Sequence, residues 1–138
     1  WNDPVKGSEL TKAQISQGAD VVFAAAGGTG VGVLQTAADE GILSIGVDSN
    51  QNYLHSGKVL TSMLKRVDIA VYEAFKAGNN LETGNFTGAV GFAMDEHNAS
   101  LVTTDMQEKV EAAEAAISGG SLSVHNYTDD ETCPAVSF

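Results

Sequence analysis

Short apolar runs alternate with helix-like segments near the start of the chain, and this alternation constrains the fold more than any other feature. The runs Asp20–Ala25 and Ile42–Val47 have the length and apolar character of strands buried on both faces of a sheet. A segment with helical spacing ends at Gly18, before the first run, and another ends at Gly41, before the second. This order of elements predicts an α/β fold with a parallel, doubly wound sheet.

Two signals compete for the start of the first helix. Asp3-Pro4 is one, because proline is favoured in the first turn of a helix. Thr11 and Gln14 form a capping box further along and are the other. The sequence leaves the choice between them open.

A further strand and helix extend the pattern, and the chain then becomes less regular. Val59–Leu64 is an expected strand, and apolar spacing predicts a helix from Arg66 to Gly78. Beyond Phe86 the expected elements are two β-like segments, a helix and a candidate last strand, followed by a tail from Asp129. In order, these elements are residues 86–92, Leu101–Thr104, Thr104–Gly119 and Leu122–Val124.

The charge balance disfavours one class of partner. The chain has 7 basic and 18 acidic residues and a net charge of -11, which repels phosphate backbones. We therefore expect no nucleic-acid partner. No apolar run approaches the roughly 20 residues that a membrane-spanning helix needs. No initiator methionine or signal peptide precedes Trp1, so we expect the chain to be part of a longer protein.

Residues suited to catalysis or metal binding are sparse. Cys133 is the only cysteine and is expected to be an incidental thiol in the tail. His55, His97 and His125 lack the spacing of a metal site. The sequence has no nucleophile elbow and no cysteine with catalytic neighbours. We therefore expect neither a metal nor a cofactor, and a function other than catalysis.

A glycine-rich turn, Gly27–Gly32, lies between the first predicted strand and the second helix. Val33 occupies the third glycine position of a dinucleotide fingerprint, and no lysine follows as in a phosphate loop. Backbone amides at such a turn can approach a polar or anionic ligand closely. A plain tight turn explains the glycines equally well, so both interpretations stay open.

Charged residues follow two of the predicted strands. Asp48 comes directly after Ile42–Val47, and Lys65 comes directly after Val59–Leu64. The carboxyl ends of parallel strands meet at one edge, where α/β sheets bind ligands. A carboxylate there suits a ribose diol, because it can accept two hydrogen bonds. Asp48 capping the next turn, and Lys65 or Arg66 serving only as a helix-entry charge, are the alternatives.

Five blocks of this sequence, in order and spacing, resemble the basic membrane protein family of ABC-transporter substrate-binding lipoproteins. Members of this family include purine nucleoside receptors. The resemblance is closest over the first seventy residues or so and looser beyond Phe86. The blocks are Trp1–Gly7, Gly18–Phe23, Ala26–Gly32, Ile45–Gln51 and Val59–Asp68.

The resemblance implies a type I periplasmic-binding-protein fold, in which two α/β lobes close on a ligand. This chain would supply most of the second lobe and a segment that crosses the hinge. Residues 1–58 would form the core of the lobe, and residues 59–80 the hinge strand and a helix returning to the first lobe. Residues 81–128 would complete the lobe, and residues 129–138 would be a tail.

The resemblance also implies a set of ligand contacts. Trp1 corresponds to an aromatic residue that stacks on the ligand ring. Gly27 or Gly28 corresponds to a backbone contact in the glycine turn, Asp48 to the carboxylate that holds ribose hydroxyls, and Lys65 to a cation at the hinge strand. The other contacts of the family belong to the first lobe, so a free nucleobase or another ligand stays possible.

A solute receptor is the function that this resemblance implies. Its partners would be a purine nucleoside or nucleobase, the amino-terminal lobe of the same protein and the permease of an ABC importer. It would lie in the periplasm or at the cell surface, anchored by a lipid on an upstream segment. The alternatives are the ligand-sensing domain of a Lac-repressor-type regulator, which shares this fold, and a nucleoside-processing enzyme that uses Asp48.

Overall fold

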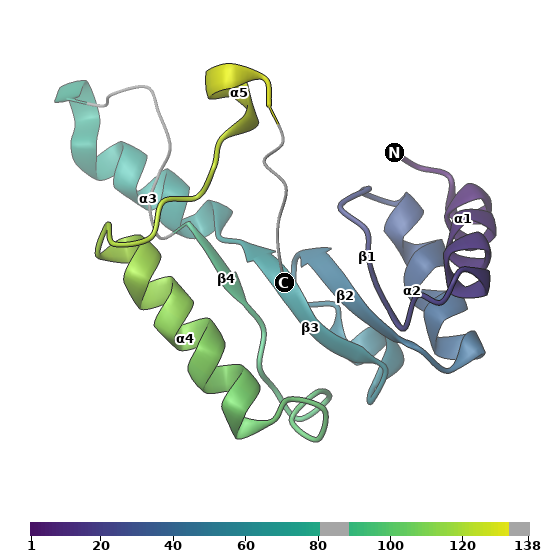
Figure 1. The fold of residues 1–138 in the computed structure, drawn as a ribbon. Coiled ribbons are helices and arrows are strands. Elements are labelled where there is room, and N and C mark those ends of the chain that lie inside the picture. Colours follow the sequence, from purple (N-terminus) through teal and green to yellow (C-terminus); the bar gives the residue numbers. More distant parts are fainter. Residues whose placement is uncertain (81–88, 133–138) are drawn as a thin grey trace. The chain divides into compact units, whose positions relative to one another are not determined.

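A sheet with strand order β1-β2-β3-β4 lies at the centre of residues 1–103 (Figure 1). The structure is a computed structural model that describes residues 1–80 and 89–132. Strands β1, β2 and β3 are parallel, and β4 pairs with β3 in the antiparallel direction. The strands are Val21–Phe23 (β1), Leu43–Asp48 (β2), Val59–Lys65 (β3) and Val90–Phe92 (β4).

Helix α1 (Pro4–Ser16) begins at the first of its two candidate start signals. The Asp3 carboxylate accepts a hydrogen bond from the backbone N–H of Lys6 at 2.9 Å, and so caps the helix. The other candidate start, at Thr11, is not used. Thr11 lies within the helix, buried, and its hydroxyl donates to the Gly7 carbonyl at 2.9 Å, which leaves it unable to cap.

Helix α2 (Thr29–Glu40) packs between α1 and the sheet, and Gly41 ends it in the predicted left-handed conformation, with φ of 81°. Its apolar face meets β1, because Val33 and Ala37 are buried against Val22. Complete burial of an aliphatic side chain of this size contributes roughly 1.5–3 kcal/mol. Other residues of this core are Ala19, Ala24 and Ile42.

Helix α3 (Val67–Ala77) follows β3, as predicted, but none of its residues is buried. A short 3-10 helix, Gly78–Asn80, ends it, and another, Asn52–His55, precedes β3. No described residue buries the apolar side of α3, and Phe75 is 83% exposed. A helix of this length usually depends on burial of its apolar face for stability. Among the described residues, α3 lacks a partner against which this face could pack.

The segments after α3 depart from the sequence predictions. Only Val90–Phe92 of the first β-like segment is a described strand, since residues 81–88 lie outside the described residues. The second predicted segment, Leu101–Thr104, is wrong. The backbone N–H groups of Leu101 and Val102 both donate to the Asn98 carbonyl, at 2.9 and 3.3 Å, which makes a turn rather than a strand.

A second compact unit begins at Thr104. Helix α4 (Thr104–Ser118) is where the capping box predicts it. The predicted strand Leu122–Val124 is wrong, because the Leu122 N–H donates to the Ala116 carbonyl at 3.0 Å and so extends the end of α4. A short helix, α5 (Tyr127–Asp130), was not predicted. Cys133 lies outside the described residues, and no described helix is long and apolar enough to cross a membrane.

A candidate ligand pocket at the strand ends

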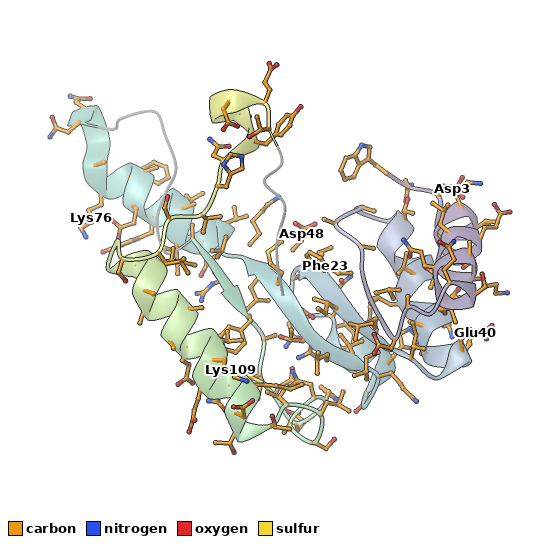
Figure 2. The ribbon with its side chains drawn as sticks, in the orientation of Figure 1. Asp3, Phe23, Glu40, Asp48, Lys76 and Lys109 are labelled. Atoms are coloured by element: carbon orange, nitrogen blue, oxygen red, sulfur yellow. The ribbon has the colours of Figure 1, made fainter. Side chains whose placement is uncertain are left out.

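An open pocket of about 430 Å³ lies where the parallel strands end. Phe23, Asp48 and Lys65 are the last residues of β1, β2 and β3. Phe23 and Asp48 are labelled in Figure 2, at the carboxyl ends of their strands. Pockets for small ligands are usually about 300–1,000 Å³. The pocket is lined by Trp1, Ala25, Gly27, Val47, Asp48, Met63 and Lys65.

Four of the five predicted site residues meet at this pocket, although they come from separate segments of the chain. They are Trp1, Gly27, Asp48 and Lys65. Gly28 lies at the start of α2 instead, outside the lining. The sequence did not single out the apolar lining residues. Two of them could have been found from their place near a strand end, because Val47 precedes Asp48 and Met63 lies near the end of β3.

The glycine turn holds the first residues of the chain against α2. Gly27 has φ of 55°, and a side chain there would come within 3.0 Å of the Trp1 carbonyl oxygen. A side chain at Gly28 would collide with the Asn2 amide oxygen. The Thr29 hydroxyl accepts a hydrogen bond from the Asp3 N–H at 3.0 Å. These glycines therefore serve, in part, to let residues 1–3 of the chain lie close to the turn.

The charged residues at the strand ends pair with each other. Lys65 Nζ lies 3.4 Å from Asp48 Oδ1, and both side chains are more than half exposed. An exposed pair of this kind contributes only about 0–1 kcal/mol to stability. Within the described residues, the Asp48 carboxylate accepts no backbone hydrogen bond from the following turn, so it does not cap it. Its charge is available to a ligand.

Arg66, the neighbour of Lys65, has a different role. Its guanidinium donates two hydrogen bonds to Asp68, at 3.1 and 2.8 Å. These bonds lower the pKa of the Asp68 carboxyl, and the same pairing raises the pKa of Arg66. Arg66 is thus the helix-entry charge of α3, and Lys65 is the cation at the pocket.

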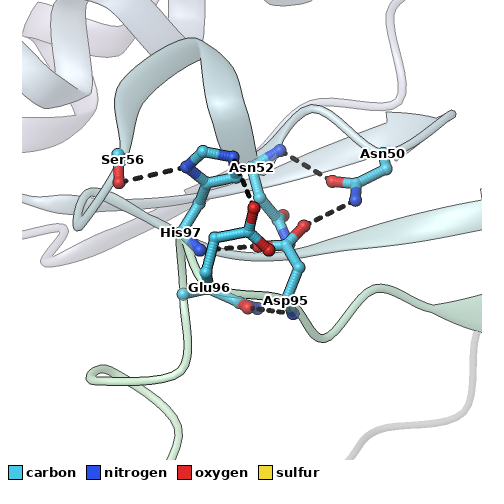
Figure 3. Close-up of polar contacts among 7 residues, drawn as sticks. Asn50, Asn52, Ser56, Asp95, Glu96 and His97 are labelled. Atoms are coloured by element: carbon cyan, nitrogen blue, oxygen red, sulfur yellow. Dashed lines mark hydrogen bonds and ion pairs between the residues drawn. The ribbon is translucent and has the colours of Figure 1, made fainter.

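A polar network joins the loop after β2 to the segment after β4 (Figure 3). Asp95 Oδ2 accepts hydrogen bonds from the side-chain amides of Asn50 and Asn52, at 2.6 and 3.2 Å. Asp95 Oδ1 accepts the His97 backbone N–H at 2.8 Å. The bond from Asn50 contributes most to lowering the pKa of the Asp95 carboxyl, and the His97 N–H lowers it further.

This network contains the one group of candidate metal ligands among residues 1–80 and 89–132. One ligand atom from each of Asp95, Glu96 and His97 lies within 4.8 Å of the others. Both oxygens of Asp95 already accept hydrogen bonds. His97 Nδ1 lies 3.3 Å from the Ser56 hydroxyl. These contacts show that the cluster links two loops to each other, and we therefore assign no metal to it.

The depressed pKa of Asp95 predicts a pH-dependent effect of Asp95→Asn. A carboxyl whose pKa is lower in the folded state stabilises the fold above its unfolded pKa of about 3.9. This stabilisation is lost as the pH falls through the folded pKa. Urea unfolding of the full-length protein should therefore show the variant less stable at pH 7, with the difference from wild type shrinking below about pH 4. A Glu96→Gln variant, changed at an exposed neighbour, is the control. A difference that is constant with pH would contradict this role of Asp95.

Comparison with known proteins identifies the family. Residues 1–125 match the family described as "Bmp: ABC transporter substrate-binding protein PnrA-like". The chain belongs to the Bmp family. Its similarity to the Bmp family, predicted from five sequence blocks, is therefore confirmed over most of the chain.

A curated protein and two crystal structures resemble this Bmp-family chain. The chain is 34% identical, over an alignment of 145 residues, to the CD4+ T-cell-stimulating antigen of Listeria monocytogenes. The alignment covers 86% of the chain and 39% of that protein. A transcriptional activator of the comK gene from Bacillus halodurans is 25% identical with a TM-score of 0.72, over 98% of this chain and 46% of that one. A solute-binding protein of an ABC transporter system from Aeropyrum pernix K1 is 23% identical with a TM-score of 0.73, over 94% of this chain and 46% of that one. The chain thus spans less than half the length of each of these three proteins. The similarity of structure confirms the predicted α/β fold of the type I periplasmic-binding class.

Proposed function

We propose that this chain supplies the second lobe of a solute receptor for an ABC importer, and that its ligand is a purine nucleoside or a related nucleobase. One observation carries the proposal. Trp1, Gly27, Asp48 and Lys65 come from separate segments and line one pocket at the carboxyl ends of the strands. The receptor binds its ligand by hinge closure and makes or breaks no bond.

The chemistry of the pocket matches the two parts of a nucleoside. The Trp1 side chain is 89% exposed, so its ring is available to stack on a base. Asp48 presents two carboxylate oxygens, which can accept bonds from adjacent ribose hydroxyls. Lys65 balances the charge of Asp48 at 3.4 Å, so the pair favours a neutral polar ligand. Val47 and Met63 supply apolar surface.

Helix α3, which the described residues leave unburied, supports the presence of a first lobe. Residues 59–80 comprise β3, α3 and the 3-10 turn that ends it, and no residue of α3 is buried. In this proposal α3 packs its apolar side against the first lobe, and β3 crosses the hinge. Residues 1–58 form the core of the second lobe, residues 81–128 complete it and residues 129–138 are a tail.

The location and the partners follow from the same proposal. The receptor lies in the periplasm or at the cell surface, anchored by a lipid on an upstream segment, and delivers its ligand to a permease. A net charge of -11 supports the expectation that no nucleic acid binds this chain.

A regulator is the second candidate, because one similar structure is described as a transcriptional activator. The chain would then be its ligand-sensing part, with the same pocket and the same ligand class. The two candidates differ in what the ligand controls. Binding to permease-containing vesicles that depends on the nucleoside supports the receptor, whereas a nucleoside-dependent change in transcription of a target gene supports the regulator.

Mass spectrometry of the small molecules released on denaturing the purified full-length protein tests the ligand assignment. Tight receptors retain ligand, so we expect a stoichiometric purine nucleoside or nucleobase. Another metabolite would contradict the purine assignment. An empty extract leads to titration with adenosine, which should bind saturably and be recovered unchanged after hours; conversion to product would indicate an enzyme.

The Trp1→Ala substitution should weaken adenosine binding. Stacking of a base on an aromatic ring contributes about 1–3 kcal/mol, which corresponds to a loss of about 5- to 150-fold in affinity. Isothermal titration of the full-length protein measures it. Trp1→Phe keeps a ring and should retain most of the affinity. Equal affinity of the alanine variant and the wild type would remove Trp1 from the site.

A further inference from the structure

Asp48 has a left-handed backbone conformation, which few residues other than glycine adopt. Its φ is 67°, in the left-handed region, and among the described residues Glu131 is the other non-glycine residue with positive φ. Residues other than glycine hold this conformation when the surrounding structure imposes it. Since φ directs the side chain, whatever fixes this angle also directs the carboxylate that faces Lys65.

The side chain of Gln51 closes the loop onto the residue before Asp48. Gln51 Oε1 accepts the backbone N–H of Val47 at 2.8 Å. The Val47 carbonyl accepts the N–H of Ser49 at 2.8 Å. Both backbone groups of Val47, the residue before Asp48, are therefore bonded to residues that follow Asp48. Loss of the bond from Gln51 would leave the Val47 N–H without this partner.

A buried hydroxyl on the neighbouring strand anchors this loop. Ser62 Oγ accepts the backbone N–H of Gln51 at 3.0 Å and donates to Asn52 Oδ1 at 2.8 Å. Ser62 and Asn52 have no exposed surface. At Gly46, a side chain would meet Ser62 Oγ at 2.6 Å and Gln51 Cβ at 2.9 Å, so the loop lies directly against β2.

The same contacts tie Asp48 to its charged partner. Ser62 lies on β3, three residues before Lys65, and Gly46 is opposite Ser62 in the register of β2 and β3. The loop that follows Asp48 is thus fixed to the strand that carries Lys65. A shift of the loop relative to β3 would change the 3.4 Å separation of the two charges.

We propose that Gln51 and Ser62 are positioning residues that hold the Asp48 carboxylate toward the pocket. They act on the ligand through Asp48 and line no part of the pocket themselves. The inference rests on the proposed function for its effect on binding. The other part of the inference, that the conformation of Asp48 depends on Gln51, can be tested without any ligand.

The test uses three variants of the full-length protein. Gln51→Leu removes the acceptor for the Val47 N–H, and Gln51→Glu keeps an acceptor oxygen of the same reach. Gln35→Leu is the matched control, because Gln35 bonds Asp39 on the exposed side of α2. Crystal structures report φ of Asp48 and its distance to Lys65. Titrations with adenosine and 2′,3′-dideoxyadenosine report whether the ribose hydroxyls still contribute to affinity.

In Gln51→Leu we expect Asp48 to leave the left-handed region and adenosine affinity to fall about tenfold or more, with little change for the dideoxy compound. Gln51→Glu and Gln35→Leu should keep the wild-type values. An unmoved Asp48 in Gln51→Leu would overturn the inference, and so would a moved Asp48 with unchanged adenosine affinity. If the wild type binds no adenosine, adenosine is not the ligand and the crystal structures alone decide the inference. If Gln51→Leu does not fold, Ser62→Ala takes its place with the same criteria.

Discussion

Asp48→Ala is expected to weaken the binding of adenosine by the full-length protein more than tenfold. In the proposed complex the carboxylate accepts hydrogen bonds from the ribose hydroxyls, and a bond to a charged group contributes about 1.5–3 kcal/mol. Asp48 is more than half exposed, and its pair with Lys65 contributes little to stability. The fold should therefore survive the substitution. Isothermal titration, with circular dichroism to verify folding, measures the effect.

Two comparisons isolate the role of the carboxylate at Asp48. Asp48→Asn keeps a side chain that tolerates the left-handed backbone and removes only the charge, so its loss of affinity should be smaller than that of Asp48→Ala. The compound 2′,3′-dideoxyadenosine lacks the hydroxyls and should bind the wild type and Asp48→Ala almost equally. Unchanged adenosine affinity in Asp48→Ala would remove this residue from the site.

Asn98→Ala is expected to destabilise the protein by about 2–4 kcal/mol. Asn98 has no exposed surface, and its side-chain amide donates to the carbonyls of Leu60 and Ala93, both at 2.9 Å. Its amide oxygen accepts the Asp95 backbone N–H at 2.9 Å. Alanine makes none of these bonds and leaves buried polar groups without them. Urea unfolding of the full-length protein measures the loss.

Two further variants distinguish these hydrogen bonds from a loss of packing. Asn98→Asp keeps the size of the side chain but turns an acceptor toward the Leu60 and Ala93 carbonyls, so it should be at least as damaging as alanine. Asn80→Ala, at an exposed position, should change the free energy of unfolding by less than about 0.5 kcal/mol. An Asn98→Ala protein as stable as wild type would show that the segment after β4 is not held by this side chain.

Local sequence patterns predicted the strands and helix ends that depend on residues close together in the sequence. The apolar runs that became β2 and β3 and the glycine that ends α2 carry their own signals, as does the capping box of α4. Thr11 carried a signal of the same kind and failed, because Asp3 had already begun the helix and Thr11 became buried inside it. A start signal identifies a possible cap, and tertiary packing selects among the candidates.

The site was predictable to different degrees. Asp48 and Lys65 follow from strand ends alone, since parallel strands bring their carboxyl ends together. The proposed role of Trp1 comes from the family resemblance. The antiparallel direction of β4 and the bond between Asn50 and Asp95 were not predictable, because they join segments far apart in the sequence. No periodicity or motif encodes such a contact.

A crystal structure of the full-length protein with adenosine tests the central claim most directly. We predict one nucleoside in the pocket at the strand ends, with its base stacked on Trp1 and both ribose hydroxyls within about 3 Å of the Asp48 carboxylate oxygens. Adenosine bound elsewhere, or absent from the pocket at saturating concentration, would contradict the account.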